Sequence, residues 1–196
     1  MALDLSSSQS VLDFWFGAPG SPEYGTARDE WFSQNAGFDR QVIERFGPLI
    51  EQALKDELAD WANEPQSALA RILLLDQFTR NGYRGTPQAF AGDALALKAA
   101  QDMVARGWDL LLRPLDRVFI YLPFEHAEDL AAQRQALHLF TKLAEADPQF
   151  VGYATWARKH HDVIERFGRF PHRNAVLGQA STPEEEAFLT QPGSRF

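Results

Sequence analysis

The chain has 196 residues, 45% of them hydrophobic and 23% charged, which is the composition of an ordinary globular protein and predicts a single domain over residues 1–196. Its formal net charge of −8 repels phosphate backbones and anionic lipids, so we expect no nucleic acid and no membrane surface as a partner. The absence of cysteine excludes disulfides, thiolate metal sites and a cysteine nucleophile.

The N-terminus and the apolar runs carry no targeting signal. Residues 1–8 have neither a basic start nor an apolar core, so they do not resemble a secretory signal. The longest apolar run, from Val118 to Phe124, is far shorter than the roughly 20 residues that cross a bilayer. We therefore expect a cytoplasmic protein.

The first helix is expected to be short. Ser10 has the position of an N-cap for a helix over residues 11–16, which stops at Gly17. Residues 18–26 are rich in Pro and Gly, and they predict an irregular loop that serves as a lid or a surface strap.

Two longer helices follow. Apolar residues at helical spacing predict an amphipathic helix over residues 38–54, with a kink or a restart at Pro48. Asn63 is expected to cap the next helix, with Pro65 in its first turn, and the apolar stripe of that helix runs to about Arg80.

The second half of the chain repeats these helix signals. Asp93 is expected to cap a helix, and a cap followed by Pro at the first helical position occurs at Thr86–Pro87 and at Thr182–Pro183. Strand signals are nearly absent and the connections are short. The prediction is an all-α array of about eight to ten antiparallel helices, which in this half cover residues 93–106, 114–121, 128–146 and 148–168.

One six-residue sequence occurs twice, at Val42–Gly47 and at Val163–Gly168. A duplicated helical hairpin would explain it. Chance similarity between two helix C-termini explains it equally well, because the match does not extend into the flanking residues.

Residues 160–174 hold three histidines and three arginines around a Gly and a Pro. His160 falls on the apolar face of the preceding helix with Trp156 and Ile164, whereas His161 lies about 100° away, toward solvent. Either His160 is a functional imidazole at a helix end, or it is a core histidine that donates to a carbonyl.

The turn after that helix is the strongest indication of a site. Arg169, His172, Arg173 and Asn174 are all polar donors, held by a Gly and a Pro. Basic residues also stabilise a helix C-terminus without any ligand, and this alternative accounts for Arg166 and Arg169 but not for the run 171–174.

A second group consists of Asp76, Arg80, Asn81 and Arg84, at another predicted helix end. Asp76 and Arg80 have the spacing of an ion pair on a helix surface. A solvated pair followed by an Asn-Gly turn and a binding site are equally good interpretations.

A third group, Glu125, His126, Glu128 and Asp129, is expected between two helices. A histidine among carboxylates suits a hard divalent metal or a general base, and acids also favour a helix N-terminus. No His-x-x-x-His spacing is present, so we predict no metal site. Phosphate-loop and dinucleotide motifs are also missing, which leaves the cofactor unknown.

Together these segments resemble domain-of-unknown-function family 924, found in bacteria and some eukaryotes. The resemblance rests on residues 76–84, 121–129 and 160–174, and it extends to residues 11–17. It implies an all-α superhelix similar to tetratricopeptide-repeat proteins, and it implies no activity. Gln179 departs from the basic residue that is typical of the family.

The favoured hypothesis is a pocket at converging helix ends that binds a small anionic ligand, in an enzyme or in a binding protein. Arginines suit a carboxylate or phosphate, and His126 or His160, oriented by Glu128 or Asp76, suits acid–base chemistry. The candidate catalytic residues are His126, His160, Glu128 and Asp76. The candidate ligand-binding residues are Arg80, Asn81, Arg84, Arg169, His172, Arg173 and Asn174.

Two alternatives remain open. The helical array is also suited to binding a peptide in a concave groove. The Arg, His and Asn side chains are equally suited to a structural role, in which they satisfy buried carbonyls at helix ends. The sequence does not indicate an oligomeric state.

Overall fold

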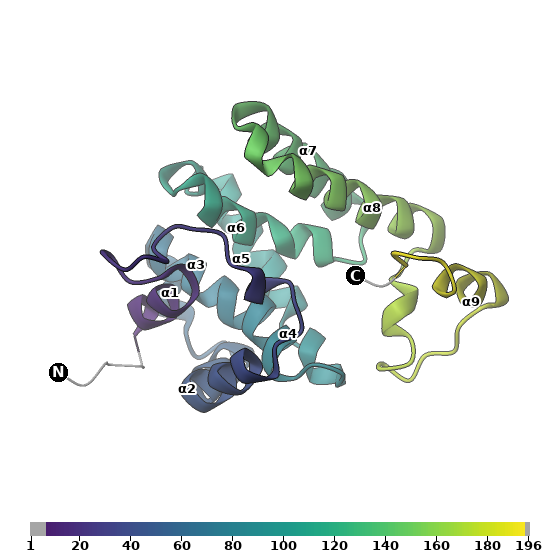
Figure 1. Ribbon diagram of the computed structural model, residues 1–196, viewed down its shortest axis with the longest axis horizontal. Helices are drawn as coiled ribbons and strands as arrows, with labels where there is room; N and C mark the ends of the chain where they lie inside the picture. The colour runs from purple at the N-terminus through teal and green to yellow at the C-terminus, as the bar shows by residue number, and fades with distance from the viewer. Residues whose placement is uncertain (1–6, 195–196) are drawn as a thin grey trace. The chain divides into compact units, whose positions relative to one another are not determined.

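The computed structural model describes residues 7–194, and these residues are mostly helical (Figure 1). They contain no β-strand, so the all-α prediction is confirmed, while the superhelical arrangement stays a prediction. Part of the segment 1–8, on which the absence of a signal was judged, lies outside the described residues. The helices are α1 (Ser8–Phe16), α2 (Ala36–Leu54), α3 (Pro65–Ile72), α4 (Thr79–Gly82), α5 (Asp93–Ala105), α6 (Pro114–His126), α7 (Leu130–Ala146), α8 (Val151–Phe167) and α9 (Pro183–Leu189).

The chain forms two compact units. The first unit extends to Arg84 and includes Gln88–Pro123, and the second consists of Gly85–Pro87 and the residues from Phe124 onward. The single domain expected from chain length stays a prediction. In the described range, no helix has the length and the apolar character needed to cross a membrane.

An aromatic cluster forms the core of the first unit. The Trp15 ring lies 5.7 Å from Trp31, 5.8 Å from Phe38, 5.3 Å from Phe78 and 5.5 Å from Phe119, measured between centroids. These rings come from α1, α2 and α6 and from two short helical segments, so one side chain joins five parts of the unit. Such pairs add about 0.5–1.5 kcal/mol each beyond the burial of their area.

Two predicted helix caps are wrong by a few residues. The side chain of Ser7 caps α1 by accepting from the main-chain N–H of Ser10, so Ser10 occupies the first turn. The N-cap of α3 is Glu64, because Pro65 takes the first helical position, and Asn63 ends a preceding 3-10 helix.

A third predicted cap has another role. Gly92 is the N-cap of α5, and Asp93 is its first helical residue. The Asp93 carboxylate is bound by the guanidinium of Arg80 at 2.8 Å and 3.1 Å, so it does not cap the helix.

Helix α2 passes through Pro48 without a restart, so the restart offered as one alternative is wrong and the kink stays a prediction. A proline inside a helix costs about 3 kcal/mol, because one hydrogen bond is lost and the ring crowds the preceding turn. The residues after it, Leu49, Ile50 and Ala53, are buried, and their burial accounts for the continued helix.

The helix expected to reach Arg80 is interrupted by a π-helical segment, Leu73–Phe78, between α3 and α4. Each residue of this segment is buried. A π-helical turn carries one extra residue, so it changes the face on which the following side chains lie, and such turns are frequent at functional sites.

The second unit contains α7 and α8, which lie side by side and antiparallel (Figure 1). The carboxylate of Asp129 caps α7 by accepting from the Ala132 N–H at 2.8 Å. Gly168 ends α8 in a left-handed conformation, with φ of 71°, as predicted. Thr182 caps α9 in a complete capping box with Glu185, which confirms the cap expected there.

We predict that Gly92→Ala lowers the free energy of unfolding by about 1–3 kcal/mol, because the added Cβ would collide with the main-chain carbonyl of Leu75. The φ of Gly92 is −90°, a value that alanine also adopts, so the variant tests the collision and not a strained backbone. Gly152→Ala is the matched control: no atom of residues 7–194 lies within 4 Å of the added Cβ, and the change should leave stability unchanged or raise it by up to about 1 kcal/mol. Equal urea midpoints for both variants would contradict the prediction.

Candidate functional site

The centre of the candidate site in the second unit is His160, on α8, which is only 6% exposed. Its Nδ1 lies 3.0 Å from the carbonyl oxygen of Trp156 and 3.0 Å from Oε1 of Glu125. A carbonyl only accepts hydrogen bonds, so the proton of the neutral ring is on Nδ1. Nε2 therefore carries the lone pair and can accept a proton or a hydrogen bond.

Burial lowers the pKa of His160 to about 3, and electrostatic interactions with His126, Arg173 and His172 contribute to the same shift. The Trp156 carbonyl favours the charged ring but does not reverse this direction. The Glu125 carboxylate at 3.0 Å also favours a charged ring, but burial is the stronger influence. His160 is thus a neutral imidazole near the guanidinium of Arg173.

The neighbours of His160 come from two other segments of the same unit. His126 is in the last turn of α6, and its ring centroid lies 6.3 Å from that of His160. Arg173 is in the 3-10 helix Pro171–Arg173, and it donates to the His126 carbonyl at 3.0 Å. Its guanidinium lies 4.5 Å from the centre of the Phe170 ring, which itself lies 5.4 Å from the His160 ring.

Four predicted site residues are therefore brought together in the second unit: His126, His160, His172 and Arg173. His172 joins the group through Phe170, because their ring centroids are 5.7 Å apart. All four come from the histidine-containing segments of the sequence.

The acid beside His160 differs from the prediction. We expected Glu128 or Asp76 to orient the histidine, and the carboxylate that contacts it is Glu125. Helix α6 was expected to end at Tyr121, which placed Glu125 in a loop, but the helix continues to His126 and carries Glu125 into the interior, where it is 3% exposed.

Glu128 has a positioning role in the structure. It is largely exposed, and its Oε1 accepts from the Phe170 N–H at 2.8 Å. This hydrogen bond fixes the start of the turn that carries Arg173. Gln133 of α7, fully buried, adds to this arrangement by donating to the carbonyls of Glu125 and Ala127 at 2.5 Å and 2.8 Å.

Two predicted ligand-binding residues, Arg169 and Asn174, are held by Glu185. Arg169 makes two hydrogen bonds to its carboxylate, at 2.6 Å and 2.8 Å, and Asn174 donates to it at 3.3 Å. Glu185 is 2% exposed, and Arg169 lowers its pKa to about 2. The sequence analysis missed Glu185, although its spacing from Thr182 is that of a capping box.

The remaining predicted residues form a separate group within the first unit. Asp76 is fully buried, so the interpretation of a solvated ion pair with Arg80 is wrong. The two side chains lie 3.9 Å apart, and Arg80 binds Asp93 more closely. Burial disfavours the charged form of Arg80, but both carboxylates outweigh it and raise the pKa of the guanidinium. Arg84 pairs with Asp39 at 3.0 Å and 3.1 Å and donates to Asn81 at 3.1 Å.

His161 was expected toward solvent, but it is 8% exposed. The buried stripe of α8 includes Ala157, His160, His161 and Ile164, with the 3–4–7 spacing of one helix face, whereas Trp156 is 43% exposed. The face is therefore rotated from the predicted one, because packing decides which edge of an apolar stripe is covered.

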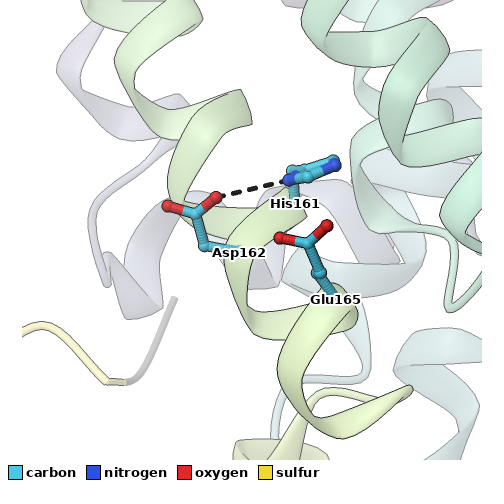
Figure 2. A group of neighbouring side chains, drawn as sticks. All are labelled: His161, Asp162 and Glu165. Carbon is cyan, nitrogen blue, oxygen red and sulfur yellow. Dashed lines mark hydrogen bonds and ion pairs between the residues drawn. The ribbon is translucent and has the colours of Figure 1, made fainter.

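His161 forms a small polar group with Asp162 and Glu165 (Figure 2), and their potential ligand atoms lie within 4.8 Å of one another. Such a group offers donors for a divalent cation. The Nδ1 of His161 lies 3.3 Å from Oδ1 of Asp162, and a hydrogen bond between them explains the geometry without an ion. The prediction of no metal site stays a prediction.

His160 should make the protein acid-sensitive. The unfolded chain binds a proton at a pKa of 6.5 and the folded protein only near 3, so stability is lost as the pH falls between these values. Between pH 7 and pH 4.5 this amounts to about 2.5 kcal/mol. We predict that His160→Asn removes this part of the pH dependence in urea unfolding curves, whereas His138→Asn, at an exposed histidine of α7, leaves it intact. Identical pH dependence for both variants would refute the assignment.

Glu185→Gln should lower the free energy of unfolding by about 1–3 kcal/mol, because Arg169 and Asn174 lose a charged acceptor. Glu186→Gln makes the same change at the next, exposed residue of α9, and its effect should stay within about 0.5 kcal/mol. Thermal unfolding of both variants measures the difference. If Glu185→Gln left the stability unchanged, that result would count against the structural role of this network.

Comparison with known proteins assigns the chain to a family. Residues 11–193 match the family described as bacterial protein of unknown function (DUF924). The solved structure of ATU0120, a protein of unknown function from Agrobacterium tumefaciens, is similar at 41% sequence identity and a TM-score of 0.81, covering 93% of this chain and 96% of that one. No curated protein matches the sequence. The chain therefore belongs to the DUF924 family, whose fold it shares and whose function is not known.

Proposed function

We propose that the second unit binds a small anionic ligand at the group formed by His126, His160, His172 and Arg173. The observation that carries this proposal is the buried guanidinium of Arg173 near His160: burial is the main cause that lowers the pKa of His160, and Arg173 with the two imidazoles adds to the shift. A buried guanidinium favours a negative charge beside it.

The chemistry of the group suits a carboxylate or a phosphate. Arg173 supplies the planar donor geometry that such anions prefer, and its position is fixed by the His126 carbonyl and by the Phe170 ring. Burial strengthens the attraction, since charges interact more strongly where water is excluded.

His160 adds a proton acceptor to this site. With Nδ1 protonated, Nε2 is the atom that can take a hydrogen bond or a proton from the ligand. At a pKa near 3 it is a weak base, but a bound anion favours the charged ring and raises that pKa. Anion binding and proton uptake are then coupled, as in a general base that is activated by its substrate.

A structural role is the second candidate, for Arg169 and Asn174 only. Both are bound to the buried Glu185, which is the specific observation that favours it. Peptide binding by a helical superhelix stays a prediction.

The test is a thermal-shift screen of the full chain against phosphorylated and carboxylate metabolites, with Arg173→Gln and Arg166→Gln as matched variants. Arg166 is a half-exposed arginine of the same unit whose guanidinium pairs with Glu184 at 2.7 Å. A ligand at a hundred times its dissociation constant adds about 2.7 kcal/mol of stability. We expect a hit that is lost in Arg173→Gln and kept in Arg166→Gln.

Coupling to protonation is checked by titration calorimetry at pH 5 and pH 7, in buffers of different ionisation enthalpy. The expected result is tighter binding and larger proton uptake at pH 5. A ligand whose affinity is equal in both arginine variants, or a screen without any hit, would overturn the proposal.

A further inference from the structure

The first unit contains a pocket that is independent of the histidine group. Its volume is about 190 Å³, and its walls come from α1, from the loop after Gly17, from the start of α3 and from residues 111–116. Most of the lining is apolar, including Leu12, Phe16 and Leu69. An engineered cavity of about 150 Å³ holds one benzene ring, so this pocket has room for a single ring with a short substituent.

The loop of residues 18–26, which the sequence predicts as a lid or surface strap, forms one wall of this pocket. It folds back over α1, where the N–H of Gly25 donates to the Phe16 carbonyl at 2.9 Å. Gly17 has a φ of 82°, and a Cβ at this position would lie 2.6 Å from the main-chain nitrogen of Tyr24. Tyr24 lines the pocket and is 46% exposed, and Leu111 on the same rim is 71% exposed.

The charges of the lining leave one carboxylate uncompensated. Arg113 is bound in a bidentate pair to Asp116, at 2.7 Å and 2.9 Å, so these two charges cancel. Asp13 accepts a hydrogen bond at 2.7 Å from Gln9, which is neutral. The pocket therefore combines apolar walls with one net negative charge.

This charge balance disfavours an anion. The Nη1 atom of Arg113 has no hydrogen-bond partner among the described residues, but it is buried beneath the strap, where a Cβ on Gly25 would lie 2.9 Å from it. An anion in the pocket would instead meet the carboxylate of Asp13. Apolar walls also disfavour a bare metal ion, which needs several oxygen ligands.

We propose that this pocket binds a small organic cation, an ammonium group on an aromatic or branched aliphatic body. The ammonium pairs with Asp13, and the body packs against Leu12 and covers the exposed rim of Tyr24 and Leu111. The Arg113 guanidinium already lies over the rings of Phe16 and Tyr24, at 5.3 Å and 4.7 Å from their centroids, so the attraction for positive charge comes from Asp13. Ligand binding thus removes two exposed apolar side chains from water.

The experiment titrates the full chain with three probes of equal size: 2-phenylethylammonium, 2-phenylethanol and phenylacetate. Two-dimensional amide NMR of the protein follows the binding of each probe. The ammonium probe should bind at least about tenfold more tightly than the other two, which is about 1.4 kcal/mol. Its chemical-shift changes should centre on residues 12–25 and 111–116. Equal affinities for the three probes would overturn the proposal, and so would a cation that does not saturate the protein at concentrations up to about 10 mM.

Two pairs of variants separate the charge from the pocket wall. Asp13→Asn should weaken binding of the cation about tenfold, whereas Asp60→Asn, at an exposed carboxylate of the same unit, should not. Gly17→Ala and Gly20→Ala place a side chain at similar positive φ, but only the Gly17 variant collides with the strap. Only Gly17→Ala should weaken binding, and unchanged affinity in both Asp13→Asn and Gly17→Ala would refute the site.

Discussion

The burial of His160 against two acceptors is the constraint on which the proposed anion site depends. Since Nδ1 faces the Trp156 carbonyl and the Glu125 carboxylate, the tautomer and the orientation of the ring are both fixed. The same burial keeps the ring neutral near the guanidinium of Arg173. A helix end, a turn and a long helix must all be in place for this arrangement, so the chemistry of the site depends on the packing of the second unit.

Several arginines of the chain are bound to carboxylates, and these arginines have a structural role. Glu185 binds Arg169, Asp93 binds Arg80 and Asp39 binds Arg84, in each case with two hydrogen bonds. These pairs connect segments that are distant in sequence and hold loops against helices. A run of arginines in a sequence therefore does not by itself indicate anion binding, because its meaning depends on the acid that packs against each guanidinium.

The repeated hexapeptide illustrates how far local sequence determines structure. Val42–Gly47 lies inside α2, which continues for another two turns, whereas Val163–Gly168 ends α8. The first copy is followed by buried apolar residues that extend the helix despite Pro48. The second is followed by a polar turn, and its glycine adopts a left-handed conformation. Six identical residues thus have two outcomes, because the residues after them pack differently.

The sequence by itself determined the all-α fold, most helix positions, the stop at Gly168 and the capping box of Thr182, because each of these depends on contacts within a few residues. It also marked His126, His160 and Arg173 as unusual. Only the tertiary structure decided that His161 is buried, that Glu125 is the acid beside His160 and that Arg173 reaches the His126 carbonyl. These contacts join residues far apart in the chain, and they arise from the packing of helices, which no local pattern encodes.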